Sequence, residues 1–319
     1  MEASARIVAV IINYKTPALC LESVRSLFSE LDSEQDQIIV VDNCSNDGSV
    51  DQLRQAISLE PWPQSRIKVV ESEYNGGFSY GNNFAMKQVV ATAYLLLNSD
   101  ATVVPGAIQA QWEALQADSK RAIVGPLVLG DDGGAQVSCF IDRSPWNEFL
   151  ATAKTGLLTK MFGWFGVREV ALPPGQPECE VDWLSFVSVL IRGAAYQDIG
   201  LMDDGYFMYK EDNDYCRRAR AKGWKVYYLP KAEVIHLNKG WSAKERARQP
   251  TFFYESRTRY FRKYYGFTGY ILANMLWTLG RLIHLFREIV QQKPSSVAAY
   301  AWRDIWTLSP GTKAIKDIK

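Results

Sequence analysis

The segment YLLLNSDATVVPGA, residues 94–107, joins an apolar run to an abruptly polar ending. The apolar run is typical of a buried β-strand, and Asn98, Ser99 and Asp100 end it before a pair of valines and Pro105. Open α/β sheets bind their ligands at the carboxyl ends of the strands. We therefore expect Asp100 to lie in a ligand site.

Three similar strand patterns precede this segment. They are residues 7–12, the sequence QIIVVDN ending at Asp42, and the sequence SRIKVVES ending near Glu71. Thr16 and Pro17 predict the start of a helix between the first two strands, as the N-cap and the first helical residue. The alternation of strands and helices predicts an α/β fold with a doubly wound, mostly parallel sheet.

Polar side chains gather at the predicted carboxyl ends of these strands. Because parallel strands end at one edge of a sheet, we expect these side chains to form a nucleotide site. They are Asn13, Tyr14, Asp42, Asn43, Asn98, Ser99 and Asp100. The sequence YNGGFSYGNN, residues 74–83, adds glycines that allow a ligand to approach the backbone closely. Asn75 and Asn82 in this sequence can bind the ligand or stabilise the turn itself, and a purely structural turn is the alternative.

A second dense segment runs from Asp203 to Leu237. Glu211, Asp212 and Asp214 open a helical pattern that becomes basic further along, an order that suits the helix dipole. The preceding aromatic sequence GYFMY should bury the first carboxylates and raise the pKa of at least one of them toward that of a general base. The sequence leaves both Glu211 and Asp212 as candidates, and we favour Asp212.

His236 ends an apolar run after this helix and is one of only two histidines in the chain. A single histidine usually has a structural role. At the end of a strand that follows an acidic helix, it is also a candidate ligand for a divalent cation.

The composition indicates a globular protein of one large domain or two. The chain has 319 residues, of which 47% are hydrophobic and 22% charged, and a formal net charge of +1. This charge argues against nucleic acid as a partner. The short apolar run at the amino end is not a signal peptide, so we expect a cytoplasmic protein.

The carboxyl-terminal part combines basic, aromatic and apolar residues. Eight basic residues between 239 and 265 outnumber two acidic ones and alternate with aromatic side chains. The basic residues are Lys239, Lys244, Arg246, Arg248, Arg257, Arg259, Arg262 and Lys263. A helical apolar stripe at Ile271, Met275, Leu279, Leu282 and Phe286 follows. This pattern predicts a helix at the surface of an anionic membrane, and packing against the catalytic domain or a dimer partner is the alternative.

Five motifs in this order resemble the family-2 inverting glycosyltransferases, and among them the bacterial branch that includes rhamnosyltransferases. The motifs are VIINY, IIVVDNCSNDGS, YNGGFSYGNN, LLLNSD and GYFMYKEDNDYCRRARAKGWKVYYLPKAEVIHL. The resemblance implies a GT-A fold in residues 1–240, with a nucleotide-binding half (1–105) and an acceptor half (106–240). Residues 241–319 would form a basic and aromatic helical extension.

The resemblance also implies roles for individual residues. Asn13 and Asp42 would contact the base and ribose, and Asp100 and His236 would hold Mg²⁺ or Mn²⁺. The nucleotide-sugar site as a whole would comprise Asn13, Tyr14, Asp42, Asn43, Asn75, Gly77, Phe78, Asn82, Asn98, Ser99 and Asp100. Asp182 and Trp183 would meet the acceptor, although Trp183 could equally be a core aromatic residue. Asn98 stands where the family's DxD motif has its first acid, which implies weaker metal binding.

The implied reaction is transfer of a sugar with inversion, with L-rhamnose from dTDP-rhamnose as the favoured donor. The acceptor would be a glycan or a lipid-linked glycan of cell-surface polysaccharide synthesis, reached at the inner face of the cell membrane. The alternatives are a UDP-sugar-dependent galactofuranosyl or hexosyl transferase, and an inactive scaffold that binds nucleotide sugars. The sequence leaves open whether the protein forms a homo-oligomer.

Overall fold

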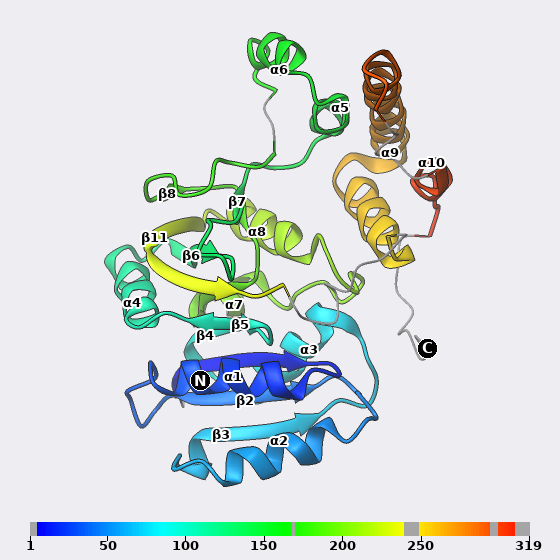
Figure 1. Ribbon diagram of the computed structural model, residues 1–319. Helices are drawn as coiled ribbons and strands as arrows, with labels where there is room; N and C mark the ends of the chain where they lie inside the picture. The colour runs from blue at the N-terminus through cyan, green and yellow to red at the C-terminus, as the bar shows by residue number, and fades with distance from the viewer. Residues whose placement is uncertain (1–4, 168–169, 239–248, 294–298, 310–319) are drawn as a thin grey trace.

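The computed structural model describes residues 5–167, 170–238, 249–293 and 299–309. Its centre is a nine-stranded sheet (Figure 1). The strands are β1 (Ala5–Asn13), β2 (Gln37–Asp42), β3 (Ile67–Glu71), β4 (Ala91–Asn98), β5 (Ala101–Val103), β6 (Arg121–Leu129), β8 (Cys179–Glu180), β10 (Ser188–Arg192) and β11 (Lys225–His236). They lie in the order β3-β2-β1-β4-β10-β6-β11-β5, and β8 pairs with β11. A separate small sheet pairs β7 (Cys139–Phe140) with β9 (Trp183–Leu184).

The mostly parallel sheet expected from the sequence is confirmed. β1, β2, β3 and β4 are mutually parallel, and β6 is parallel to β11. β10 lies antiparallel between β4 and β6, and β5 is antiparallel to β11. The apolar run that His236 ends belongs to one long strand, β11. The register of β11 shifts between Leu229 and Glu233, because Pro230 between them has no N–H to donate to β6.

Helices cover both faces of the sheet. One face carries α1 (Pro17–Phe28), α2 (Ser49–Ser58) and α4 (Ala107–Ala117), and the other carries α3 (Gly77–Met86), α7 (Gly193–Ile199) and α8 (Glu211–Ala221). Along β1, Ile7, Ala9 and Ile11 face the first layer, while Val8 and Val10 face the second. This alternation explains the unbroken apolar runs in the sequence, since both faces of these strands are buried.

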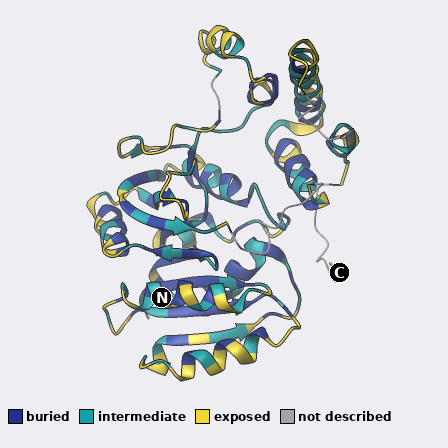
Figure 2. Ribbon diagram, in the orientation of Figure 1, coloured by how far each residue is buried: buried dark blue, intermediate teal, exposed yellow. Residues whose placement is uncertain are grey.

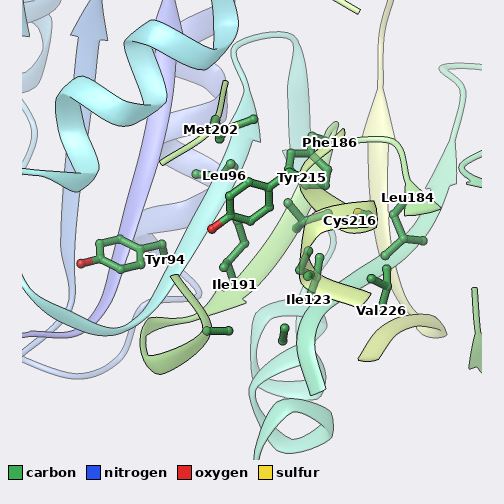
Figure 3. Packing of buried hydrophobic residues seen from close by; sticks show 14 of the residues in the cluster. Tyr94, Leu96, Ile123, Leu184, Phe186, Ile191, Met202, Tyr215, Cys216 and Val226 are labelled. Atoms are coloured by element: carbon green, nitrogen blue, oxygen red, sulfur yellow. The ribbon is translucent and has the colours of Figure 1, made fainter. Parts of the chain in front are cut away.

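A hydrophobic core lies between the sheet and α8, on the face that also carries α3 and α7. Tyr215 and Cys216 of α8 pack over Ile123, Ile191 and Val226 of the sheet, together with other apolar side chains (Figure 3). Burial of this face fixes α8, so the residues at the amino end of α8 have a defined position relative to the strand ends.

The carboxyl-terminal region is helical, as the sequence predicts. α9 (Thr251–Val290) is interrupted by a kink at Gly266, whose φ is 67°. Before the kink, Lys263 and Tyr264 bind the buried Asp214 of α8, with Lys263 Nζ 2.5 Å and Tyr264 Oη 2.8 Å from Asp214 Oδ1. This part of α9 is therefore attached to the helix that carries Glu211 and Asp212.

After the kink, α9 packs against α5 (Pro145–Ala153), beside α6 (Gly156–Gly163) and α10 (Ala299–Asp304) (Figure 1). The two helix backbones approach closely at Gly280, where a Cβ atom would lie 2.3 Å from Thr152 Oγ1. The opposite face of α9 is exposed (Figure 2). No described helix contains a stretch that is both long and apolar enough to span a bilayer. The domain boundary predicted at residue 240 lies outside the described residues, as do Lys239, Lys244, Arg246 and Arg248.

Candidate functional site

A pocket of about 400 Å³ lies at the carboxyl ends of β1 and β4. Eleven of the residues that the sequence singles out line it. They are Tyr14, Asn43, Asn75, Gly77, Phe78, Asn98, Ser99, Asp100, Glu211, Asp212 and His236. The strand-end residues and the acidic helix, which are more than 100 positions apart in the sequence, thus meet in one cavity.

The strand register brings the first group together. Asn13 lies opposite Asp42 in the β1–β2 pair, and Ile12 lies opposite Asn98 in the β1–β4 pair. Asn13 and Asp42 are fully buried beside the pocket and do not line it. Asn13 Nδ2 donates to Asp42 Oδ1 at 2.6 Å, and Ser45 donates to the same carboxylate. Their contact with the base and ribose stays a prediction.

The glycine-containing sequence 74–83 joins the strand-end side of the pocket to the segment before α8. Asn43 Nδ2 donates to Asn75 Oδ1 and to the Gly77 carbonyl, both at 3.0 Å. Gly77 has a φ of +82°, and Phe78 N donates to the Phe207 carbonyl at 2.9 Å. A Cβ atom on Gly77 would lie 1.9 Å from that carbonyl oxygen, so only glycine allows this contact. Asn82 lies behind the loop, where its Nδ2 donates to the Phe78 carbonyl.

Asp100 and His236 face each other across the pairing of β5 with β11. His236 Nε2 lies 3.3 Å from Asp100 Oδ1, and His236 Nδ1 lies 3.3 Å from Gln136 Oε1. Within the described ranges, no three or more His, Cys, Asp or Glu side chains cluster around one point. The pair supplies two ligands, one oxygen and one nitrogen. This fits a Mg²⁺ or Mn²⁺ ion that takes its other ligands from a diphosphate and water.

The amino end of α8 projects Glu211 and Asp212 into the pocket. Tyr209 and Lys210, directly before it, both have left-handed backbones with φ of 71° and 72°. Two consecutive non-glycine residues in this region are strained, and such strain is concentrated at functional sites. Glu211 Oε2 is buried and accepts no hydrogen bond from any described residue.

Burial perturbs the pKa values of both carboxylates. Burial and the neighbouring Asp212 raise the pKa of Glu211 well above its usual value. Burial raises the pKa of Asp212 to about 6, although Lys210 opposes the shift. Burial and Arg143 lower the pKa of Lys210 to about 7. With a pKa of about 6, Asp212 is mostly ionised near neutral pH, which suits it as a general base.

The two predicted acceptor residues lie outside this pocket. Trp183 is buried, its ring stacks on Phe140 with centroids 3.9 Å apart, and its Nε1 donates to the Ile141 carbonyl. Asp182 accepts from the backbone N–H of Asp142 and pairs with Arg220 at 3.3 Å. Both residues support the wall behind α8, so their contact with an acceptor stays a prediction.

The pocket also contains residues that the sequence did not mark as site residues, among them Thr16, which it marked only as a helix N-cap. They are Ile12, Thr16, Ser185, Phe186, Val187, Phe207, Met208, Tyr209 and Asn238. Phe207, Met208 and Tyr209 belong to the aromatic sequence before α8. That sequence predicts burial of the first carboxylates and does not predict that these side chains line the pocket. Ser185 and Val187 reach the pocket because β10 pairs with β4, and Asn98 N donates to the Val187 carbonyl at 2.9 Å. A signal for that long-range pairing is not present in the local sequence.

Comparison with known proteins gives matches over most of the chain. Residues 8–159 match the model of glycosyl transferase family 2. An N-acetylglucosaminyl-diphospho-decaprenol L-rhamnosyltransferase of Mycobacterium tuberculosis is 25% identical over 227 residues, which are 62% of this chain and 66% of that protein. The low-salt glycan biosynthesis hexosyltransferase Agl10 of Haloferax volcanii is 26% identical, over 71% of this chain and 66% of that protein. The matches thus span just under two thirds of each relative.

Solved structures share the architecture. The structure of GalNAc-T7 with UDP, GalNAc and Mn²⁺ superposes with a TM-score of 0.61 at 14% sequence identity, covering 91% of this chain and 58% of that one. At this identity the likeness concerns the fold.

Proposed function

The chain carries a glycosyltransferase family 2 domain with a GT-A fold, and on this premise we propose that it transfers a sugar from a nucleotide donor to an acceptor hydroxyl with inversion. The observation that carries the proposal is the meeting of Asp100, His236 and Asp212 in one pocket at the strand ends. A candidate metal pair and a candidate base in one cavity are what a single displacement at an anomeric carbon needs.

The donor would lie along the strand ends with its diphosphate near Asp100. Asn43 and Asn75, which already bind each other, offer further polar groups there. Asp100 and His236 would hold Mg²⁺ or Mn²⁺, which when bound neutralises negative charge on the leaving diphosphate. One structural neighbour supports the proposal of a divalent metal, because GalNAc-T7 was solved with Mn²⁺ and UDP.

Asp212 would act as the base. Its carboxylate takes the proton of the acceptor hydroxyl, whose oxygen forms a bond to the anomeric carbon as the bond to the diphosphate oxygen breaks. Attack from the side opposite the leaving group inverts the configuration. A pKa of about 6 leaves Asp212 ionised at neutral pH yet basic enough to accept a proton. Glu211 is the rival candidate, and its raised pKa favours the protonated form there.

L-Rhamnose from dTDP-rhamnose is the donor we favour, and the acceptor would be a glycan or a lipid-linked glycan. The similarity to the mycobacterial L-rhamnosyltransferase supports this choice. A UDP-sugar-dependent hexosyltransferase is the second candidate, and the similarity to the Haloferax hexosyltransferase favours it.

Contact with a membrane surface is part of the proposal. The exposed face of α9 carries Met275, Leu279, Leu282 and Phe286, with 49–67% of each residue accessible. α6 and the residues after it add Leu157, Met161, Trp164 and Phe165, of which Trp164 is 94% exposed. Apolar side chains at this density on two neighbouring helices suit the interface of a bilayer.

A thermal-shift panel tests the donor. dTDP-rhamnose, UDP-sugars and GDP-sugars are each added with and without Mg²⁺ or Mn²⁺. A ligand at about 100 times its Kd stabilises the folded state by roughly 2.7 kcal/mol. We expect the largest metal-dependent shift with dTDP-rhamnose. A preference for UDP-sugars would replace the donor, and the absence of any shift would favour the inactive scaffold.

Asp100→Ala tests the metal pair. Removing the carboxylate leaves His236 as the single remaining member of the pair, so the metal-dependent part of the donor shift should fall by at least about 1 kcal/mol. Asp47→Ala, at the exposed turn before α2, is the control and should retain the full response. An unchanged metal response in the Asp100 variant would remove Asp100 from the metal site.

A further inference from the structure

A second cavity, of about 560 Å³, lies on the other side of the Tyr209–Lys210 turn. Tyr209, Glu211 and Asp212 line the first pocket, while Lys210 lines the second. The walls of this cavity come from α5, both halves of α9, and α10 and the residue that follows it. It therefore opens where the carboxyl-terminal helices meet the catalytic centre.

The cavity is strongly basic. Arg143, Lys210, Arg257 and Arg281 line it, against a single carboxylate from Glu148. Arg143 Nη1 lies 2.5 Å and Arg257 Nε 2.9 Å from the two oxygens of Glu148. Burial alone would raise the pKa of Glu148, but these two guanidinium groups hold it at about 2. Glu148 thus stays ionised and pairs with two of the four cationic side chains, Arg143 and Arg257.

Three buried guanidinium nitrogens of the residues that line this cavity lack acceptors within the described ranges. Arg257 is only 3% exposed, and its Nη2 has no hydrogen-bond partner among the described residues. The buried Nε atoms of Arg143 and Arg281 likewise meet no acceptor within the described ranges. A buried charged donor without an acceptor is costly to keep, so these groups indicate a ligand rich in acceptor oxygens.

The remaining wall is apolar and aromatic. Phe253, Trp277 and Ile305 line it, and the Arg281 guanidinium lies 5.8 Å from the centroid of the Trp277 ring. From Arg281, the same helix continues into the exposed apolar face at Leu282 and Phe286. A ligand with a charged head and an apolar tail would match this change from basic cavity to apolar surface.

We propose that this cavity binds a phosphate or diphosphate ester group, with Arg257, Arg281 and Lys210 as its donors. Arginine is suited to the task because its planar fork of N–H groups matches two phosphate oxygens at once. The proposal rests on the proposed function in one respect, since the ester would be the anionic part of an acceptor whose hydroxyl reaches Asp212. A free inorganic anion offers the same chemistry.

Binding is measured by calorimetry on the full chain with EDTA present and no divalent cation. Under these conditions the carboxylates of the first pocket disfavour anions. The probes are inorganic pyrophosphate, farnesyl diphosphate and, as an uncharged control, farnesol. Arg281→Gln is the main variant, because Arg257 also holds Glu148 and its replacement could unfold the contact of α5 with α9. Arg54→Gln, on α2 at the far side of the sheet, removes the same charge as a control.

We expect both diphosphates to bind the wild-type protein and Arg281→Gln to weaken them roughly tenfold, or about 1.4 kcal/mol. Arg54→Gln should bind like the wild type. Tighter binding of farnesyl diphosphate than of pyrophosphate would identify a lipid-linked ester, and equal binding a free anion. Absence of binding to the wild type, or equal affinity in the Arg281 variant, would overturn the proposal.

The nucleotide-sugar thermal shift of the same variants separates this result from the proposed function. A normal donor shift with no diphosphate binding would reject the basic cavity and leave the transferase intact. Diphosphate binding that depends on Arg281, with no donor shift, would support the basic cavity and reject the proposed binding of a nucleotide sugar.

Discussion

At the scale of single residues, the proposed chemistry depends on which of two adjacent carboxylates, Glu211 or Asp212, is ionised. Burial raises the pKa of both carboxylates, and Lys210 opposes the rise at both. The charge of Asp212 adds to the rise at Glu211, whereas Lys210 is the main group that opposes it at Asp212, whose pKa is about 6. Asp212 is therefore the better candidate for an ionised base at neutral pH.

Asp212→Asn should abolish transfer and preserve donor binding. Loss of a general base lowers the rate by roughly 10²- to 10⁴-fold, while the nucleotide contacts lie elsewhere in the pocket. The measurement is turnover beside the donor thermal shift, with Glu211→Gln as the matched comparison. Full turnover of the Asp212 variant, with loss in the Glu211 variant, would transfer the role to Glu211.

The same variant should be more stable than the wild type at neutral pH. Because the fold raises the pKa of Asp212 from 3.8 to about 6, ionisation costs stability as the pH rises through this window. Asp212→Asn should therefore raise the free energy of unfolding at pH 7 by about 1 kcal/mol or more, and give little gain below pH 4. Urea unfolding at both pH values checks this. A lower stability at pH 7 would contradict the raised pKa.

The rate of transfer should fall on the acidic side. The base must be ionised to accept a proton, so we expect kcat/KM to be half-maximal near pH 6 and to decline below it. A rate profile from pH 5 to 8 tests this expectation. A rate that stays level down to pH 5 would assign the proton transfer to another group.

The sequence predicts individual site residues where a local pattern marks them. Asp100 and Asp212 each follow a distinctive run, and both line the pocket. Gln136, which contacts His236, lies in a loop without any such pattern. The basic cavity was missed for a similar reason, since its charged residues come from segments far apart in the chain and only the folded protein brings them together.

At the scale of elements, locally coded strands were predicted and long-range pairings were not. β1 to β4 are apolar runs whose order follows from alternation with helices. β10 is also apolar, but its antiparallel insertion pairs it with residues of β4 that are 91 to 99 positions away and with residues of β6 that are 66 to 68 positions away. That insertion brings Ser185 and Val187 to the pocket, and no local periodicity encodes it.

Gly77, at the start of α3, is required for two reasons that can be tested separately: its positive φ and the close approach of the Phe207 carbonyl. Gly77→Ala introduces a Cβ atom into the Phe207 carbonyl, in addition to the strain of a positive φ. Gly106→Ala is the matched control, because its φ is +84° and its Cβ would meet no atom within 4 Å. We expect the control to lose about 1–2 kcal/mol of unfolding free energy. Gly77→Ala should lose more and bind donor weakly, and equal losses would show that the contact is unimportant.

At the scale of the whole molecule, the α/β part around the sheet and the carboxyl-terminal helices are joined by buried charge. Asp214 connects α8 to the first half of α9, and Glu148 connects α5 to Arg257 on the same helix. Removing one partner of such a pair lowers stability by more than the pair contributes to it, because the other charge is left buried and unpaired. Deletion of residues 266–319 would also uncover Phe149 and Leu150, so it would confuse loss of folding with loss of membrane contact.

Substitutions on the exposed face test membrane contact more cleanly. Leu282→Ser together with Phe286→Ser should reduce binding to vesicles that contain phosphatidylglycerol by at least about tenfold, since each side chain loses its apolar insertion energy. Leu59→Ser, at an 81% exposed leucine after α2, is the control and should bind normally. Unchanged vesicle binding with a smaller oligomer would assign the face to a second copy of the chain. If neither vesicle binding nor the oligomeric state changes, this face of α9 contacts neither a membrane nor a second copy of the chain.

The Tyr209–Lys210 turn has a consequence for regiochemistry. Its backbone separates the pocket of the proposed base from the basic cavity by a single residue, because Lys210 lines one and Glu211 and Asp212 line the other. An acceptor anchored by its phosphate would present its sugar to Asp212 at a fixed distance from that phosphate. Only the hydroxyl at the matching distance would be glycosylated, so the length of this turn, rather than any contact with the sugar ring, would select the linkage position.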